Sequence, residues 1–278
     1  NLATGARDPR SAGRDRMTLT FAKPGDVTLH YHLRPGAPGA RPVVFLNSLG
    51  TDFRIWQGVV DRLGDMSVLM MDKRGHGLSD AGEASIAGLA GDVSDLMDHL
   101  GLSNALICGV SVGGMIAQAL AAARPDLVAG LVLCNTGAKI GDAAFWNARI
   151  ETVQASGLDA MADAILERWF SPGFRANKPA ELAGYRNMLS RTTATGYAAT
   201  CAAIRDADLR ESTRMITVPT TCIGGTEDLS TPPDLVTALA GMIPDATLTI
   251  IDDVGHLPCI EAPEVVADEI TTLWKALG

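Results

Sequence analysis

A serine at position 111 stands in a sequence context that could make it a nucleophile. Residues 109–114 read G-V-S-V-G-G, follow a short apolar run and open a helical pattern of small residues. Between a strand and a helix, G-x-S-x-G forms a tight turn that lifts the serine hydroxyl out of the sheet. The helix that follows points its N-terminus at the same place, which favours an anion there. We therefore predict that Ser111 is a nucleophile, against the alternative of a glycine-rich turn with an incidental serine.

A serine hydroxyl needs a base to take its proton. The chain has five histidines. His30 and His32 fall on a predicted opening hairpin, His76 in a glycine-rich loop and His99 on a helix. His256 follows the last predicted strand, and ligands bind at that end of the strands in parallel sheets. We therefore predict that His256 is the base, and a capping or surface histidine is the alternative.

The base in turn needs a carboxylate to orient its ring and to stabilise its charged form. Residues 224–228 read G-G-T-E-D and follow the predicted strand 218–223. Asp228 is the predicted acid, and Glu227 remains a competitor because the sequence does not say which carboxylate points inward. A serine, an acid and a histidine in this order, each at a strand end, are far more specific together than any one alone.

Attack of a serine on a carbonyl group creates an oxyanion, which two backbone N–H groups could stabilise. One predicted donor is Val112, the residue directly after Ser111. The other is Leu49, in the loop N-S-L-G-T that follows the predicted strand 43–46. Both donors belong to the backbone, so the prediction depends on the loop positions rather than on their side chains.

Short apolar runs alternate with longer helical patterns, which is typical of a mostly parallel sheet covered by helices. The sequence predicts an opening hairpin and six further strands, at 19–21, 27–31, 43–46, 68–71, 106–109, 128–134, 218–223 and 248–251. Helices are expected at 55–63, 86–100, 113–123 and 265–277. Only helical patterns occur between 138 and 214. We therefore predict an α/β fold with an eight-stranded sheet, a core of residues 17–137 and 215–278, and a helical cap over 138–214.

Composition limits the class of partner. The formal net charge of −9 argues against nucleic acid and anionic membranes as general partners. No apolar run reaches the roughly 18 residues that span a bilayer. Five scattered cysteines without C-x-x-C spacing indicate reduced, buried thiols in a cytoplasmic protein and make a zinc site unexpected. Residues 1–16 are polar and arginine-rich, and we expect a disordered extension or a remnant of cloning there.

The chain resembles the α/β-hydrolase superfamily over nearly all of residues 17–278, and within it the 3-oxoadipate enol-lactonases. The resembling segments are F-L-N-S-L-G-T (45–51) with Trp56, D-K-R-G-H-G-L-S (72–79), G-V-S-V-G-G-M-I-A-Q (109–118), N-T-G-A-K-I (135–140) and W-N-A-R-I (146–150). Val112 departs from the methionine often found after the nucleophile. The resemblance implies an enzyme of aromatic catabolism that opens β-ketoadipate enol-lactone to 3-oxoadipate through an acyl-enzyme, with no metal or organic cofactor.

The substrate of that family is a small lactone with a free carboxylate, and arginine offers a carboxylate two parallel hydrogen bonds. The predicted cap supplies three candidates, Arg149, Arg168 and Arg191, each with a solvated helix position as its alternative. Trp146 is a candidate for the pocket wall, with a position in the core as its alternative.

Other functions remain open at this stage. A carboxylesterase, or a hydrolase of carbon–carbon bonds in ring-cleavage products, would use the same three residues. A non-catalytic ligand receptor of this fold is disfavoured by the intact set of Ser111, Asp228 and His256. A haloalkane dehalogenase is disfavoured because Ser111 stands where such an enzyme needs an acid. The sequence leaves the oligomeric state open.

Overall fold

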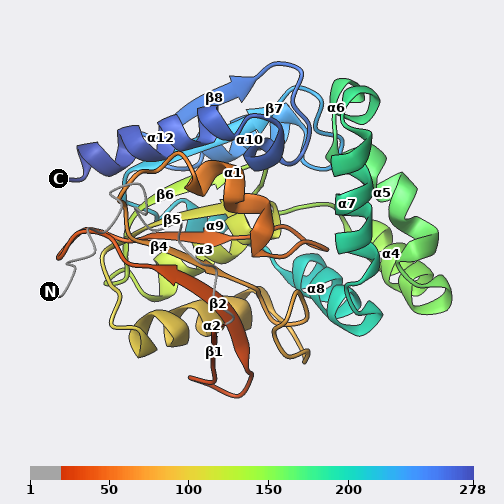
Figure 1. The fold of residues 1–278 in the computed structure, drawn as a ribbon, viewed down its shortest axis with the longest axis horizontal. Coiled ribbons are helices and arrows are strands. Elements are labelled where there is room, and N and C mark those ends of the chain that lie inside the picture. Colours follow the sequence, from red (N-terminus) through yellow and green to blue (C-terminus); the bar gives the residue numbers. More distant parts are fainter. Residues whose placement is uncertain (1–19) are drawn as a thin grey trace, which may run out of the picture.

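The computed structural model describes residues 20–278, and eight strands in this range form one sheet in the order β1-β2-β4-β3-β5-β6-β7-β8 (Figure 1). The strands are β1 (Thr20–Ala22), β2 (Leu29–Arg34), β3 (Val43–Leu46), β4 (Val68–Met71), β5 (Ala105–Val110), β6 (Val128–Cys134), β7 (Thr220–Gly225) and β8 (Thr247–Ile251). β1 pairs antiparallel with β2, and β2 antiparallel with β4. All other pairs are parallel. The predicted α/β fold with a mostly parallel, eight-stranded sheet is confirmed.

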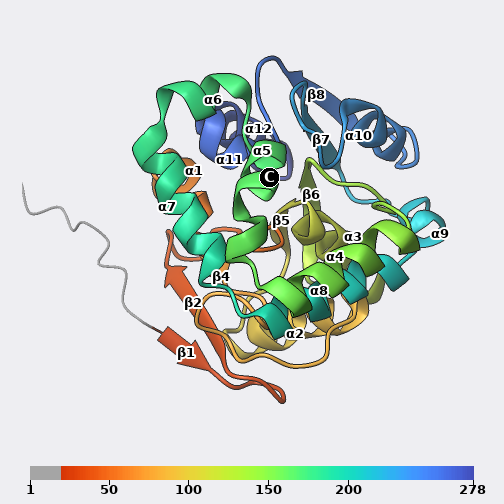
Figure 2. The ribbon, with the colours of Figure 1, turned by 90° about the vertical axis from the view of Figure 1, so that its right-hand side faces the viewer.

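Helices cover both faces of the sheet, which explains why its central strands are apolar throughout. Every residue of β3, β4 and β5 is buried. The helices α2 (Ile86–His99) and α3 (Val112–Ala123) pack together on one face, and α10 (Pro233–Ala240) lies over β7 and β8. The opposite face carries α12 (Pro263–Ala276), which contacts α1 (Gln57–Val60) and α11 (Pro258–Glu261) (Figure 2).

Between β6 and β7 the chain forms helices only. They are α4 (Ala143–Ser156), η2 (Asp159–Met161), α5 (Ala162–Trp169), α6 (Pro172–Asn177), α7 (Pro179–Ser190), α8 (Ala194–Asp206) and α9 (Arg210–Thr213). The helices α4 to α8 gather at one end of the sheet, and α9 packs on α3 (Figure 1). α4 packs on α8, and α5 packs on α7. We propose residues 138–214 as the extent of a cap that stands over the carboxyl ends of the parallel strands.

Some elements differ from the sequence-based expectations. The helix expected at 55–63 is a 3-10 turn, η1 (Phe53–Trp56), followed by the single helical turn α1. The turn begins early because the Asp52 side chain accepts a hydrogen bond from the Arg54 amide and caps it. The extension expected at 1–16 lies outside the described residues. Within 20–278, no helix has the length and apolar character needed to cross a membrane.

Candidate active site

Ser111 occupies a strained turn between β5 and α3. Its backbone has φ 59° and ψ −122°, a conformation that non-glycine residues rarely adopt. The neighbouring glycines make this turn possible: a Cβ on Gly113 would overlap the carbonyl oxygen of Leu46, and one on Gly109 would overlap Gly113 itself. Ser111 is the N-cap residue of α3, but its side chain makes no capping hydrogen bond. The hydroxyl is therefore left available at the N-terminus of the helix.

His256 lies in the loop between β8 and α11, and its ring is fixed from one side. Its Nδ1 lies 2.9 Å from Oδ2 of Asp228 and 3.2 Å from Oγ1 of Thr231. Because a carboxylate can only accept, Nδ1 carries the proton and Nε2 is left with its lone pair. The backbone amide of His256 donates to the carbonyl of Trp169 in α5, at 2.8 Å. The cap thus helps to hold the position of this histidine.

Of the two adjacent carboxylates, Asp228 is the one that contacts His256. Its Oδ1 accepts from the amides of Ser230 (2.7 Å) and Thr231 (3.0 Å). Its Oδ2 accepts from Thr231 Oγ1 (2.6 Å) and Asn135 Nδ2 (2.7 Å), in addition to the His256 ring. Burial alone would raise the pKa of Asp228, but the charge that His256 carries when protonated and these hydrogen bonds outweigh it and hold the pKa below its ordinary value.

The predicted oxyanion donors are the backbone amides of Val112, directly after Ser111, and of Leu49, in the loop that follows β3. Within residues 20–278, neither the Leu49 amide nor the Val112 amide donates to a protein acceptor. The next amide in the first loop, that of Gly50, is used: it donates to Nε2 of His76 at 2.9 Å. Burial first, and the nearby charge of Lys73 second, hold the pKa of His76 well below its ordinary value, so the ring stays neutral and can accept this bond.

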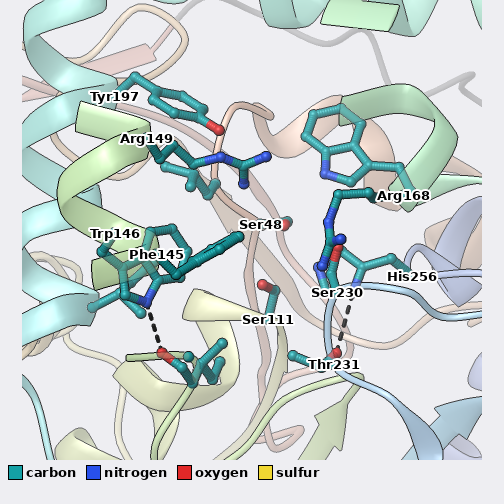
Figure 3. Close-up of a pocket in the computed structure, with 15 residues that line it drawn as sticks. Ser48, Ser111, Phe145, Trp146, Arg149, Arg168, Tyr197, Ser230, Thr231 and His256 are labelled. Carbon is teal, nitrogen blue, oxygen red and sulfur yellow. Dashed lines mark hydrogen bonds between the residues drawn. The ribbon is translucent and has the colours of Figure 1, made fainter. Parts of the chain in front are cut away.

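A cavity of about 160 Å³ lies under the helices that follow β6, and both Ser111 and His256 line it. In Figure 3 the Ser111 hydroxyl points into this cavity, with His256 at its side and Arg149 and Arg168 above it. Leu49 and Trp146 also line the cavity, and the indole N–H of Trp146 donates to the carbonyl of Ile140 at 2.7 Å.

The charged residues that line this cavity are Arg149, Arg168 and the titratable His256, with no carboxylate among the described lining residues. The guanidinium carbons of Arg149 and Arg168 lie 5.3 and 5.8 Å from the ring centre of Phe145. Burial and the charge of Arg149 lower the pKa of Arg168, but an arginine stays charged in proteins. Nε of Arg168 is buried without a hydrogen-bond partner in the described part of the chain. The cavity wall is therefore cationic, although the charge of Asp228, which does not line the cavity, acts on Arg168 from behind that wall.

Arg191 does not join the other predicted binding residues. It is the C-cap residue of α7 and lines a separate hollow of about 580 Å³, together with Asp52, Arg54 and Tyr185. This hollow lies between the end of α7 and the η1 segment, so the prediction that Arg191 lines the Ser111 site is not supported. Arg168, a further candidate arginine of the cap, lies inside the cavity instead.

Three residues of the site were missed by the sequence analysis: Asn135 and Thr231, which hold Asp228, and Phe145, which meets both cavity arginines. Thr231 had a local signal, because an aspartate often caps the backbone and hydroxyl two and three residues on. Asn135 had none, since its partner lies 93 residues away. For metals, the described residues contain no group of three His, Cys, Asp or Glu side chains that could hold an ion.

Comparison with known proteins identifies the class. The family model for the alpha/beta hydrolase fold matches residues 41–263, and the chain belongs to this family. It is 34% identical to 3-oxoadipate enol-lactonase 2 of Acinetobacter baylyi, over 90% of this chain and 94% of that enzyme. The crystal structure of the enol-lactonase from Burkholderia xenovorans superposes with a TM-score of 0.89 at 36% identity, covering 92% of this chain and all of that one.

A further similar structure is a thermophilic esterase from Thermogutta terrifontis, solved with malate bound. Its TM-score is 0.85 at 28% identity, with 94% of this chain and 97% of that chain covered. The family and these relatives agree that the chain is an enzyme of the hydrolase class.

Proposed function

We propose that this chain is a serine hydrolase that opens the lactone ring of β-ketoadipate enol-lactone. The observation that carries the proposal is the cavity in which Ser111 and the Asp228-bound His256 face a cationic wall. The similarity to 3-oxoadipate enol-lactonases supports the choice of substrate. On the same grounds we place the enzyme in aromatic catabolism, and its five buried, unpaired cysteines support a cytoplasmic location.

In the first half-reaction, Oγ of Ser111 attacks the lactone carbonyl while Nε2 of His256 takes the hydroxyl proton. The tetrahedral oxyanion rests on the amides of Leu49 and Val112. Collapse breaks the bond between the acyl carbon and the ring oxygen. The ring oxygen leaves as an enol after taking the proton from His256, and the enol then becomes a ketone. An enol is a better leaving group than a simple alkoxide, so the ring opens readily.

In the second half-reaction, the acyl group stays on Ser111 until water attacks it. His256 removes a proton from that water, and the same two amides hold the second oxyanion. His256 then returns the proton to Ser111 and 3-oxoadipate is released. The Asp228 carboxylate keeps the ring of His256 oriented through both steps and stabilises its charged form.

The free carboxylate of the substrate fits the charge of the cavity. Arg149 and Arg168 both reach the cavity, and Arg149 has no hydrogen-bonding or ionic partner among residues 20–278. A carboxylate placed beside these guanidiniums would relieve their mutual repulsion and accept from the unpartnered Nε of Arg168, whose Nη2 already donates to the Leu229 carbonyl. Trp146 forms an apolar part of the wall against which a lactone ring would pack.

A carboxylesterase acting on neutral esters is the second candidate, and the similarity to the esterase from Thermogutta terrifontis favours it. One experiment separates the two. Loss of ultraviolet absorbance of β-ketoadipate enol-lactone is followed beside release of p-nitrophenol from a neutral ester. A kcat/KM for the lactone at least about 100-fold above that for the ester supports the lactonase, as expected when a buried charged contact contributes to binding. Rapid ester cleavage with an untouched lactone would overturn the proposal and favour the esterase.

A further inference from the structure

The proposed mechanism does not use one buried charge, the ammonium group of Lys73, which is separated from the end of β4 by Asp72. The residue is only 5% exposed. Its Nζ donates to the carbonyl oxygen of Ser48 at 2.5 Å and lies 3.5 Å from that of Thr51. Within the described residues it forms no salt bridge, and burial lowers its pKa to about 7 even though Asp72 and Asp52 oppose the shift. A buried lysine without an ion pair is costly, so the carbonyl contact calls for an explanation.

The carbonyl that Lys73 holds belongs to the same peptide group as the Leu49 amide. A peptide unit is planar and trans, so its C=O and N–H point in opposite directions. When Lys73 fixes the Ser48 carbonyl on one side, the Leu49 N–H is aimed the other way. Leu49 lines the cavity that contains Ser111. The lysine therefore controls the direction of the amide that is the proposed oxyanion donor.

The charge adds to this geometric effect. A cation that donates to a carbonyl oxygen draws electron density from the whole peptide group, which makes its N–H a stronger donor. The effect is largest in a site from which water is excluded. Thr51 Oγ1 also donates to the Ser48 carbonyl, at 2.9 Å, but it is neutral. Among the described residues, Lys73 is thus the one charged group that acts on this peptide.

We propose that Lys73 is a positioning residue of this enzyme, whose ammonium group orients and polarises the Ser48–Leu49 peptide for the developing oxyanion. The proposal rests on the serine-hydrolase function proposed above. It explains why the neighbouring amide of Gly50 is tied to His76. The loop has two anchors, one on each side of the Leu49 amide, and only that amide is left free between them.

The test replaces Lys73 with methionine, which keeps the length of the side chain, and with glutamine, which keeps a neutral donor. Lys139→Met is the matched control, because Lys139 also donates to two backbone carbonyls, at 2.9 and 2.8 Å, but those belong to Arg205 and Ala207 in the cap. Removal of an oxyanion donor costs about 100- to 1,000-fold in kcat. We expect kcat to fall about 100-fold in Lys73→Met and about 10-fold in Lys73→Gln, with KM changed less than about 3-fold. The control should keep the wild-type kcat.

A second readout separates transition-state stabilisation from general damage. A boronic acid, which forms a tetrahedral adduct with a nucleophilic serine, is titrated against each variant beside 3-oxoadipate, which binds as the planar product. Boronate affinity should fall in parallel with kcat/KM, while product affinity stays constant. A Lys73→Met enzyme with wild-type kcat, or equal losses in boronate and product affinity, would overturn the proposal.

Two further outcomes are distinguishable. If circular dichroism shows that Lys73→Met does not fold, Lys73→Gln is compared with Thr51→Val. The proposal requires that Lys73→Gln lose more kcat than Thr51→Val. An equal or smaller loss in Lys73→Gln overturns it. The neutral ester is assayed with the lactone throughout. A wild type active only on the ester overturns the lactone substrate but leaves Lys73 under test. A wild type inert to ester, lactone and boronate overturns both proposals.

Discussion

The side-chain amide of Asn135 donates at 2.7 Å to the same oxygen of Asp228 that faces His256. Asn135 follows β6 with a φ of 43°, in the left-handed region that asparagine tolerates better than most residues. Its Nδ2 also donates to the carbonyl of Gly255, at 3.1 Å, next to the histidine. One amide therefore ties the proposed acid to the loop of the proposed base.

Replacing Asn135 with glycine should impair catalysis without straining the backbone, because glycine accepts a positive φ. The pKa of Asp228 lies below its ordinary value in the folded chain. The negative charge of this carboxylate, and the stability that it contributes, are therefore lost only as the pH falls through that lowered pKa. Removing one donor raises the folded pKa of Asp228, so acid unfolding followed by circular dichroism should begin at a higher pH than in the wild type. We expect kcat to fall about 10-fold at neutral pH, since a hydrogen bond to a charged group contributes about 1.5–3 kcal/mol. An unchanged onset of acid unfolding would contradict the contribution of Asn135 to the Asp228 carboxylate.

Arg149→Met should weaken binding of the anionic lactone and spare the neutral ester. A charged hydrogen bond of about 1.5–3 kcal/mol predicts that kcat/KM for the lactone falls by roughly 10- to 150-fold. Arg191→Met serves as control, because it removes a cap arginine that lies outside the cavity. Steady-state kinetics on both substrates decides. Equal effects of the two substitutions on the lactone would mean that the cavity arginine does not bind its carboxylate.

The sequence predicted those parts of the molecule that depend on local pattern. β3, β4 and β6 have the predicted boundaries because each is a continuous apolar run between turn-forming segments. Ser111 and His256 could be predicted as site candidates because Ser111 follows the buried strand β5 and His256 follows the edge strand β8, and the carboxyl ends of parallel strands meet at one edge. Their assembly around one cavity follows from the sheet order rather than from any single motif.

The parts that depend on packing between distant segments could not be predicted. Asp228 and Glu227 are adjacent, and only the hydrogen bonds from Asn135 and Thr231 show which of the two faces inward. The candidate arginines Arg168 and Arg191 have similar helical surroundings in the sequence. Which one reaches the cavity is decided by how α5 and α7 pack on each other and on the body.

Gly113→Ala should destabilise the protein, because a Cβ there overlaps the backbone carbonyl of Leu46 in β3. Neither the start of α3 nor β3 can move away without breaking the sheet. Forcing extra atoms into a packed core costs about 1–3 kcal/mol or more. Gly91→Ala is the matched control: Gly91 lies in α2, and an added Cβ there has no neighbour within 4 Å. It should stabilise the helix by about 0.5–1 kcal/mol. Urea unfolding of both variants checks this, and similar stabilities would contradict the close approach of α3 to β3.

The buried ammonium of Lys73 also predicts how stability depends on pH. Its folded pKa is about 7 against an ordinary value of 10.5, so between these values the unfolded chain binds more protons than the folded one. Stability then rises with pH across this window and is constant with respect to this group below about pH 7, where the lysine is protonated in both states. Asp72 and Asp52 limit the lowering of the Lys73 pKa by burial because they favour the charged form. His76 lies near the same ammonium group, whose charge adds to burial in lowering the pKa of His76.

Lys73→Met removes this dependence. Urea unfolding from pH 6 to 9.5 should therefore show the variant gaining most over the wild type at pH 6, with the gain shrinking steadily as the pH rises. The same substitution lowers kcat if Lys73 positions the Leu49 amide. A variant that is more stable and less active at pH 6 would show that the charge is kept for the oxyanion rather than for the fold. A gain in stability that does not change with pH would mean that Lys73 stays protonated in the folded chain up to pH 9.5, which contradicts a lowered pKa for this buried lysine.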